Sequence, residues 1–218
     1  MGKTVDEEKE YYALTIRVWR ILAPFYDILT MPFLSRLRDQ VVDFANPTKG
    51  SRILDVATGT GEQALAFARR GYEVVGVDLS EDMLRVAKRK NKFGNVKFEL
   101  ADATNLPFED GSFEVTCISF ALHDMPLSIR EKVLKEMARE TNPRGTVVIV
   151  DYGLPRGKVG RFLAYHFVKL YEAQYYSSFI KSDLVALLRQ TGIEVREDIP
   201  ALLGAGRILK GTPSLNVA

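Results

Sequence analysis

The sequence holds 218 residues, of which 46% are hydrophobic and 27% charged, with a formal net charge of +2. A chain of this length can bury a sufficient core without disulfide bonds or a structural metal ion. The single cysteine, Cys117, excludes an intramolecular disulfide and a thiolate metal cluster. The near-neutral charge gives no case for nucleic-acid binding. The polar start, and the lack of a long apolar run, predict a cytoplasmic protein with no integral membrane segment.

Two helices are expected ahead of the first strand. Apolar and aromatic residues recur at helical spacing across residues 8–22, and Pro24 should end that helix. A second helix is expected over residues 32–44, followed by a loop that contains Asn, Pro and Gly. We therefore predict a helical N-terminal cap over residues 1–46 and a core domain over residues 47–218.

Short strands then alternate with helices. The expected strands are 52–56, 73–77, 96–100, 113–119 and 146–150, and the expected helices are 62–70, 80–90 and 126–140. Strands that alternate with helices imply a parallel sheet that is covered on both faces.

The end of the chain follows a different pattern. We expect an aromatic-rich helical stretch over residues 157–176, within a lid insertion that spans residues 153–180. A short helix should follow with Ser182 as its N-cap, and residues 193–199 and 207–211 should form a hairpin. The predicted fold is a doubly wound, Rossmann-like α/β fold with a mostly parallel seven-stranded sheet and a C-terminal antiparallel hairpin.

The strongest motif is Leu-Asp-Val-Ala-Thr-Gly-Thr-Gly at residues 54–61, between the first strand and its helix. Gly59 and Gly61 let the backbone turn sharply and let a ligand approach without a Cβ in the way. Ligands of open α/β sheets bind at the carboxyl ends of the strands, and Asp78 closes the next strand. A carboxylate there can accept hydrogen bonds from the hydroxyls of a ribose, as in nicotinamide enzymes and methyltransferases alike.

A third element separates these two classes. Asp102-Ala103 closes the third strand, and Leu-Pro-Phe at residues 106–108 leads toward the fourth. With the preceding motifs, residues 50–151 closely resemble the class I S-adenosylmethionine-dependent methyltransferases. Ala-Pro-Phe-Tyr-Asp at residues 23–27, together with residues 105–108, is most similar to the ubiquinone/menaquinone biosynthesis methyltransferase group.

The resemblance implies which residues contact S-adenosylmethionine. Three carboxylates would hold its polar groups: Asp55 the amino group, Asp78 the ribose and Asp102 the adenine amino group. The other implied contacts are Ala57, Thr58, Gly59 and Gly61 at the methionine part, Leu79, Met83 and Ala103 at the adenine, and Phe120 near the sulfonium.

The chain departs from the family after the fourth strand. The quinone enzymes tend to carry Arg-Asn where this chain has His123-Asp124, which argues against assuming a quinone ring as the acceptor. We predict His123 as a candidate catalytic base, against the alternative of a purely structural hydrogen bond. The expected acceptor is small or lipid-like, and apolar or aromatic, with no metal involved. The acceptor atom and the oligomeric state, a homodimer included, stay open.

Two other functions stay open. An NAD-dependent oxidoreductase is suggested by Gly59, Gly61 and Ala64, which fit the dinucleotide pattern, and by the Tyr-x-x-x-Lys spacing of Tyr165 and Lys169. That function does not explain the carboxylate after the third strand. The other is a non-catalytic cofactor-binding module, against which intact cofactor residues argue only mildly.

Overall fold

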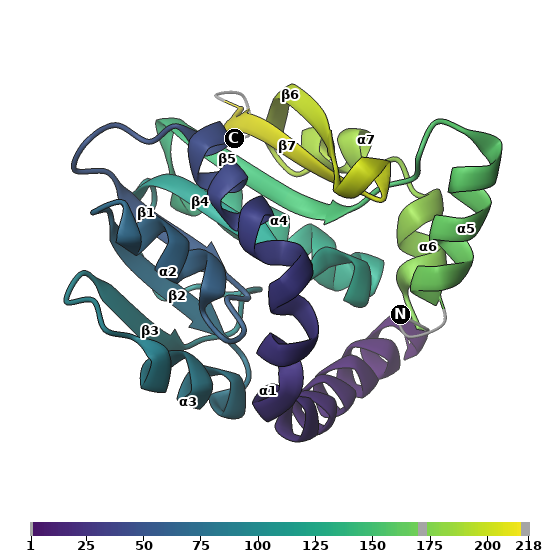
Figure 1. Ribbon diagram of the computed structural model, residues 1–218, viewed down its shortest axis with the longest axis horizontal. Coiled ribbons are helices and arrows are strands. Elements are labelled where there is room, and N and C mark those ends of the chain that lie inside the picture. Colours follow the sequence, from purple (N-terminus) through teal and green to yellow (C-terminus); the bar gives the residue numbers. More distant parts are fainter. Residues whose placement is uncertain (1, 170–173, 215–218) are drawn as a thin grey trace.

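A computed structural model describes residues 2–169 and 174–214, and its core is a seven-stranded sheet of order β3-β2-β1-β4-β5-β7-β6 (Figure 1). The strands are β1 (Arg52–Val56), β2 (Glu73–Asp78), β3 (Val96–Leu100), β4 (Phe113–Ser119), β5 (Thr141–Tyr152), β6 (Ile193–Ala201) and β7 (Gly206–Pro213). The first five strands pair in parallel, whereas β7 is antiparallel to both β5 and β6. The doubly wound sheet and its C-terminal hairpin are confirmed.

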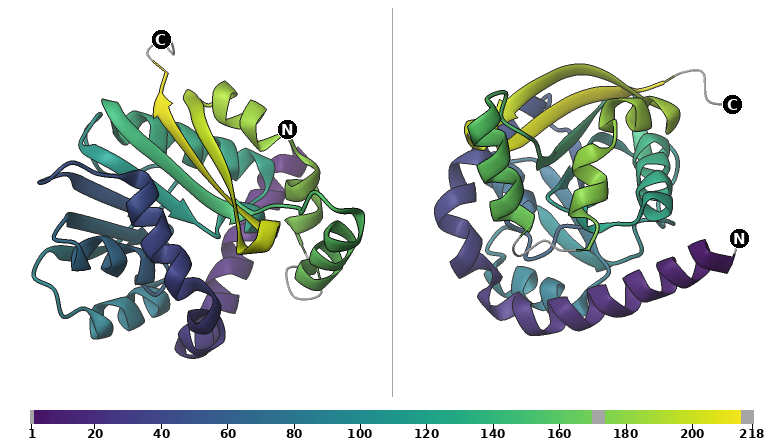
Figure 2. Two further views of the ribbon diagram at one scale, coloured as in Figure 1. Left: turned by 45° about the horizontal axis from the view of Figure 1, so that its top comes forward. Right: turned by 90° about the vertical axis from the view of Figure 1, so that its right-hand side faces the viewer.

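Helices cover both faces of the sheet (Figures 1 and 2). They are α1 (Gly2–Ala45), α2 (Glu62–Arg69), α3 (Glu81–Lys90), α4 (Leu127–Glu140), α5 (Lys158–Lys169), α6 (Tyr176–Lys181) and α7 (Leu184–Gln190), with short 3₁₀ turns η1 (Leu122–Asp124) and η2 (Leu202–Gly204). One buried cluster joins the sheet to α2, α3 and the C-terminal half of α1, and a second joins it to α4, α6 and α7. Buried β-branched and aliphatic runs in the central strands are typical of a sheet packed on both faces.

The N-terminal region differs from the prediction of two helices. The chain is helical from Gly2 to Ala45, through both Pro24 and Pro32. The helix does not end at Pro24 as expected, but α1 bends sharply between its two halves (Figures 1 and 2). A proline inside a helix removes one N–H donor and crowds the preceding turn, so the helix kinks where we expected it to end. The C-terminal half packs on the sheet through Leu37 and Val41.

Two further details correct the prediction near the C-terminus. The N-cap of α7 is Asp183, whose carboxylate accepts a hydrogen bond of 3.0 Å from the Ala186 N–H. Ser182, the expected cap, instead donates from its hydroxyl to the Phe179 carbonyl at the end of α6. The helical stretch expected over residues 157–176 forms α5 as far as Lys169, and α6 begins only at its last residue, Tyr176. Residues 170–173 lie outside the described residues. The division into cap, core and lid stays a prediction.

Candidate functional site

A cavity of about 130 Å³ lies at the carboxyl ends of the parallel strands, beneath the N-terminal half of α1. Most of the residues predicted to contact the cofactor line it: Ala57, Thr58, Gly59, Asp78, Leu79, Met83, Asp102, Ala103 and Phe120. The helix α1 adds Tyr11, Tyr12, Thr15, Trp19 and Tyr26. The structure thus brings four strand ends and one aromatic helix face to a single cavity.

Asp78 is held in place by the backbone on either side of it. The Gly59 N–H donates to its Oδ2 at 2.7 Å, and the Ser80 N–H donates to its Oδ1 at 2.8 Å. Burial raises the pKa of the Asp78 carboxyl, and these backbone donors oppose that rise. Each carboxylate oxygen keeps acceptor capacity for a ligand hydroxyl. A Cβ on Gly59 would meet no atom within 4 Å, so a ligand can lie against this backbone.

Asp55 and Gly61 are near the cavity but do not line it. Asp55 is buried and accepts a hydrogen bond of 2.5 Å from the Thr58 hydroxyl. Burial raises the pKa of Asp55 to about 7, an effect that the Thr58 hydroxyl opposes. A Cβ on Gly61 would lie 2.6 Å from Phe98 Cζ, so this glycine is needed for core packing. Asp55 is therefore connected to the cavity through Thr58, which lines the cavity and donates this hydrogen bond.

Two non-glycine residues of the site adopt left-handed backbone angles. Ala57 and Phe120 both have φ of 51°, a region that costs free energy for residues with a Cβ. Neighbouring backbone hydrogen bonds of 2.8 Å hold these turns, from the Thr58 N–H to the Val77 carbonyl and from the Phe120 N–H to the Val150 carbonyl. The sheet therefore fixes both turns at the cavity wall.

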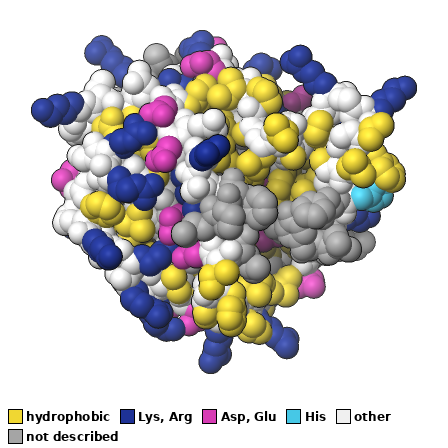
Figure 3. Space-filling view, in the orientation of Figure 1, with side chains coloured by type: hydrophobic (Ala, Val, Ile, Leu, Met, Phe, Trp, Pro, Cys, Tyr) yellow, Lys and Arg dark blue, Asp and Glu magenta, His cyan; other side chains and the backbone are white. Residues whose placement is uncertain are grey.

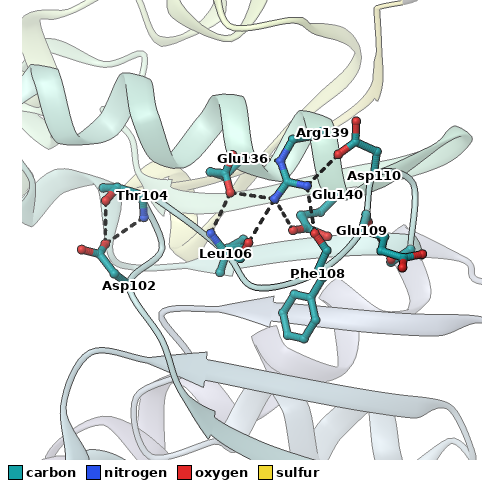
Figure 4. Close-up of polar contacts among 10 residues, drawn as sticks. Asp102, Thr104, Leu106, Phe108, Glu109, Asp110, Glu136, Arg139 and Glu140 are labelled. Carbon is teal, nitrogen blue, oxygen red and sulfur yellow. Dashed lines mark hydrogen bonds and ion pairs between the residues drawn. The ribbon is translucent and has the colours of Figure 1, made fainter.

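Asp102 accepts hydrogen bonds on both oxygens. The N–H and the hydroxyl of Thr104 each donate to Oδ1 at 2.8 Å (Figure 4), and the Tyr12 hydroxyl donates to Oδ2 at 2.8 Å. The last bond joins α1 to the loop after β3. The N-terminal half of α1 therefore closes over the cavity at the position of Asp102.

The loop after β3 is fixed from its other side by Arg139 of α4 (Figure 4). This guanidinium donates to the carbonyls of Leu106 and Phe108 and pairs with Glu136 at 2.8 Å. Glu136 in turn accepts a hydrogen bond of 2.7 Å from the Leu106 N–H. No motif in the sequence marks Arg139, because the two carbonyls that it binds lie about thirty residues earlier in the chain.

Arg38 is a second site residue that the sequence did not reveal. Among the described residues it is the one Lys or Arg that lines the cavity, and its side chain is only 10% exposed. Its Nη1 lies 3.5 Å from Glu62 Oε2, yet this nitrogen makes no hydrogen bond within the described part of the chain. A buried N–H without an acceptor is costly, so an acidic ligand group would be stabilised here. No motif surrounds Arg38, which looks like any helical arginine.

His123 lies behind the cavity wall. Its ring is 3% exposed, and its Nδ1 is 2.8 Å from Oδ1 of the fully buried Asp151, at the end of β5. The Tyr152 ring packs against it with centroids 4.6 Å apart. His123 does not line the cavity, whereas Ala121 and Asp124 on either side of it do. No motif in the sequence marks Asp151 as the partner of His123.

A buried guanidinium accompanies this pair. Arg130 of α4 donates from Nε to the Met125 carbonyl at 2.9 Å, and its guanidinium lies 5.2 Å from the centre of the Phe179 ring. Burial lowers the pKa of Arg130, and the charge of Asp151 opposes that change. The buried carboxylate of Asp151 thus has a cation in its surroundings as well as the His123 ring.

The two residues that suggested an oxidoreductase, Tyr165 and Lys169, lie away from the cavity. The Tyr165 hydroxyl lies 3.1 Å from Ser177 Oγ on α6, and neither Tyr165 nor Lys169 lines the cavity. Within residues 2–169 and 174–214, no three His, Cys, Asp or Glu side chains are grouped to hold a metal ion. In the same residues, no helix is long and apolar enough to cross a membrane.

Known proteins resemble this chain over its core. A family model described as a methyltransferase domain matches residues 53–145. The demethylmenaquinone methyltransferase of Renibacterium salmoninarum is 40% identical over 138 residues, which are 62% of this chain and 56% of that protein. That of Thermus thermophilus is 38% identical, over 68% of this chain and 71% of that protein. The chain thus spans little more than half the length of the first of these relatives.

A further relative is the ubiquinone/menaquinone biosynthesis C-methyltransferase UbiE of Geobacter sulfurreducens, which is 32% identical over 76% of this chain and 71% of that protein. Among solved structures, a chain of the complex between the Haloferax volcanii Trm112 methyltransferase activator and a putative methyltransferase has a TM-score of 0.71 at 16% identity, covering 90% of this chain and 97% of that one. The magnesium protoporphyrin IX methyltransferase of Synechocystis, with bound SAH, has a TM-score of 0.65 at 18% identity, covering 83% of each chain. These two structures share the fold.

Proposed function

Since this chain belongs to the class I S-adenosylmethionine-dependent methyltransferases, in the group of the ubiquinone/menaquinone biosynthesis enzymes, we propose that it methylates a quinol-like lipid acceptor. The observation that carries the proposal is the cavity itself, where most of the residues predicted to contact the cofactor meet an aromatic face of α1. The names of the relatives support the acceptor class, because they act on demethylmenaquinone or serve ubiquinone and menaquinone synthesis.

The cavity residues fit S-adenosylmethionine, the cofactor of this family. Arg38, with a buried N–H that lacks an acceptor, would hold the carboxylate of its methionine part. The open backbone at Gly59 leaves room for that part, and Asp78 would accept from the ribose hydroxyls. Asp102 would accept from the adenine amino group. Asp55 would support the amino end of the cofactor through Thr58.

The remaining wall suits a flat apolar acceptor. Tyr11, Trp19, Tyr26 and Phe120 line the cavity from α1 and from the end of β4. Aromatic faces attract a sulfonium cation and also pack against an aromatic ring. These side chains would exclude water and hold the acceptor in line with the methyl group, which is most of what such a transfer requires of the protein.

His123 is proposed as the base. Bound S-adenosylmethionine would supply an electrophilic methyl group to the acceptor. When Nδ1 of His123 donates to Asp151, Nε2 is the basic nitrogen of the ring. Because its ring does not line the cavity, it would accept the proton that the acceptor loses through one bridging water. The flanking residues Ala121 and Asp124 line the cavity, which supports this role for η1.

The proposal is tested by binding and then by turnover. Calorimetric titration should show binding of S-adenosylmethionine and none of NAD, and Asp78→Asn should weaken that binding, whereas Asp82→Asn on the surface of α3 should not. Transfer of labelled methyl to a reduced short-chain demethylated naphthoquinone then tests the acceptor class. Binding of NAD alone would overturn the family-based cofactor assignment for this chain. Binding of S-adenosylmethionine without transfer to any quinol would instead favour a non-catalytic module.

A further inference from the structure

The apolar stripe of α5 faces outward. Val159, Phe162 and Leu163 follow the i, i+3, i+4 spacing that normally marks the side of a helix packed on the core. Here they are 73%, 62% and 61% exposed. His166, one turn further, is also exposed, and its ring lies 4.3 Å from that of Phe162. Figure 3 shows hydrophobic side chains gathered over α5, at the right of the view. Large exposed apolar patches usually mark an interaction surface.

The opposite side of α5 is firmly attached to the protein. Val168 is buried, and the Tyr165 hydroxyl lies 3.1 Å from Ser177 Oγ. The Tyr165 ring also packs on the Tyr176 ring of α6, with centroids 5.9 Å apart. The outward stripe is therefore presented by a packed helix, and the fold leaves it without a covering element among the described residues.

The surroundings of the stripe are basic. Residues 152–171 contain Arg156, Lys158, Arg161 and Lys169 and no Asp or Glu. All four basic side chains are exposed. A helix with an apolar face containing Phe and Leu, flanked by Lys and Arg, is typical of segments that lie in the interface of an anionic bilayer.

From these observations we propose that α5 docks on an anionic lipid surface, with Val159, Phe162 and Leu163 inserted among the lipid chains. The stripe is on a helix at the rim of the molecule, away from the sheet (Figures 1 and 2), which suits insertion into a soft surface. The helix follows β5, so it lies at the same edge of the sheet as the cavity. A lipid-like acceptor would pass from that surface to the cavity, but the docking itself does not depend on the proposed activity.

Co-sedimentation with vesicles tests the docking, using the full chain and no cofactor. Vesicles of phosphatidylcholine with 30 mol% phosphatidylglycerol, roughly the anionic content that attracts basic segments, should bind the protein more tightly than phosphatidylcholine alone. Phe162→Ser/Leu163→Ser should weaken binding about tenfold or more. Lys158→Gln/Arg161→Gln should weaken it about fivefold per charge. Ile21→Ser/Leu127→Ser, which changes two exposed aliphatic residues on α1 and α4, should bind like the wild type.

Calorimetry with S-adenosylmethionine and circular dichroism show whether each variant is folded, and the charge variant serves if the serine variant is not. Equal binding of the wild type and both α5 variants would overturn the proposal, as would no binding to anionic vesicles. A wild-type dimer that the serine variant converts to a monomer, without vesicle binding, would assign the stripe to a second copy of the chain. Vesicle binding that survives when methyl transfer is absent would leave the docking intact and reject only the proposed activity.

Discussion

The hydroxyl of Tyr12, on the N-terminal half of α1, donates a hydrogen bond of 2.8 Å to Oδ2 of Asp102, ninety residues later in the chain. The same hydroxyl lies 3.2 Å from Thr104 Oγ1. A second link, the ion pair of 2.7 Å between Glu8 and Lys132, ties the same half of the helix to α4. The cover of the cavity is thus attached to a residue that the family resemblance assigns to the adenine.

Tyr12→Phe should weaken the binding of S-adenosylmethionine. A hydrogen bond to a carboxylate contributes about 1.5–3 kcal/mol, and its loss releases α1 from the cavity edge. We expect an increase of roughly tenfold in the calorimetric Kd, because part of that free energy goes into closing the cover. Tyr72→Phe removes a hydroxyl that donates to the Pro47 carbonyl, remote from the cavity, and should leave the Kd unchanged. Tighter binding by Tyr12→Phe would mean that Tyr12 competes with the adenine for Asp102.

Arg38→Met should remove the recognition of one chemical group of the cofactor. Charge-assisted hydrogen bonds contribute about 1.5–3 kcal/mol, so we expect S-adenosylmethionine to bind roughly 10- to 100-fold more weakly. Decarboxylated S-adenosylmethionine should bind the wild type and the variant equally, because it lacks the group that Arg38 would hold. Arg69→Met, which breaks an exposed pair with Asp39, is the matched control. An equal loss for both ligands would assign Arg38 to the structure of the pocket.

The sequence predicted the features that depend on local pattern. We could predict the order of the strands along the chain, the glycine loop and the strand-end carboxylates Asp78 and Asp102. The structure brings the loop and these carboxylates to one cavity at the ends of the strands. The sequence alone did not reveal features that depend on contacts between distant parts of the chain. Pro24 breaks an isolated helix, but here tertiary packing keeps α1 continuous. Arg38 and Asp151 have no local motif, because their partners come from other elements.

The contribution of Asp55 to the stability of the cofactor-free protein should fall as the pH rises from about 4 to about 7. Asp55 has a pKa of about 7 in the folded chain and about 3.9 when unfolded, so the folded state binds the extra proton in this window. The free energy of unfolding therefore decreases with pH, by at most about 4 kcal/mol for this group. Urea unfolding at pH 5 and pH 8 measures the decrease in the free energy of unfolding between these pH values. This decrease should be smaller in Asp55→Asn than in the wild type. Asp43→Asn on the surface should not change the difference, and an equal loss in Asp55→Asn would contradict the assignment.

Arg139→Met should destabilise the fold and also loosen the loop that carries Asp102. Arg139 is the cation beside the buried Glu140, whose pKa burial raises to about 7. Removing one partner of a buried pair costs about 3–5 kcal/mol, and we expect about 2–4 here because Arg139 is 30% exposed. Arg144→Met, an exposed control, should cost little, and Arg139→Met/Glu140→Gln should recover part of the loss. Chemical denaturation measures both. A loss confined to stability, with the Kd for S-adenosylmethionine unchanged, would show that Arg139 does not position the loop.

His123→Gln should lower kcat while cofactor binding is kept. A positioned base contributes roughly 10²- to 10⁴-fold to the rate, and the His123 ring does not line the cavity, so its loss should spare the cofactor contacts. Methyl transfer to a soluble short-chain quinol measures kcat, and calorimetry measures the Kd for S-adenosylmethionine. His166→Gln, an exposed histidine on α5, is the matched control and should behave as the wild type.

The pH profile separates a base from a packing residue. If His123 accepts the proton, kcat/KM of the wild type rises with pH as the ring loses its own proton, and this limb disappears in His123→Gln. Asp151→Asn should lower kcat as well, because an amide that presents its N–H to Nδ1 would favour the tautomer with the proton on Nε2. If kcat/KM of His123→Gln were lower at every pH but still rose with pH as in the wild type, His123 would only support the structure of η1. The proton acceptor would then have to be sought among the cavity-lining residues, of which Asp124 is adjacent.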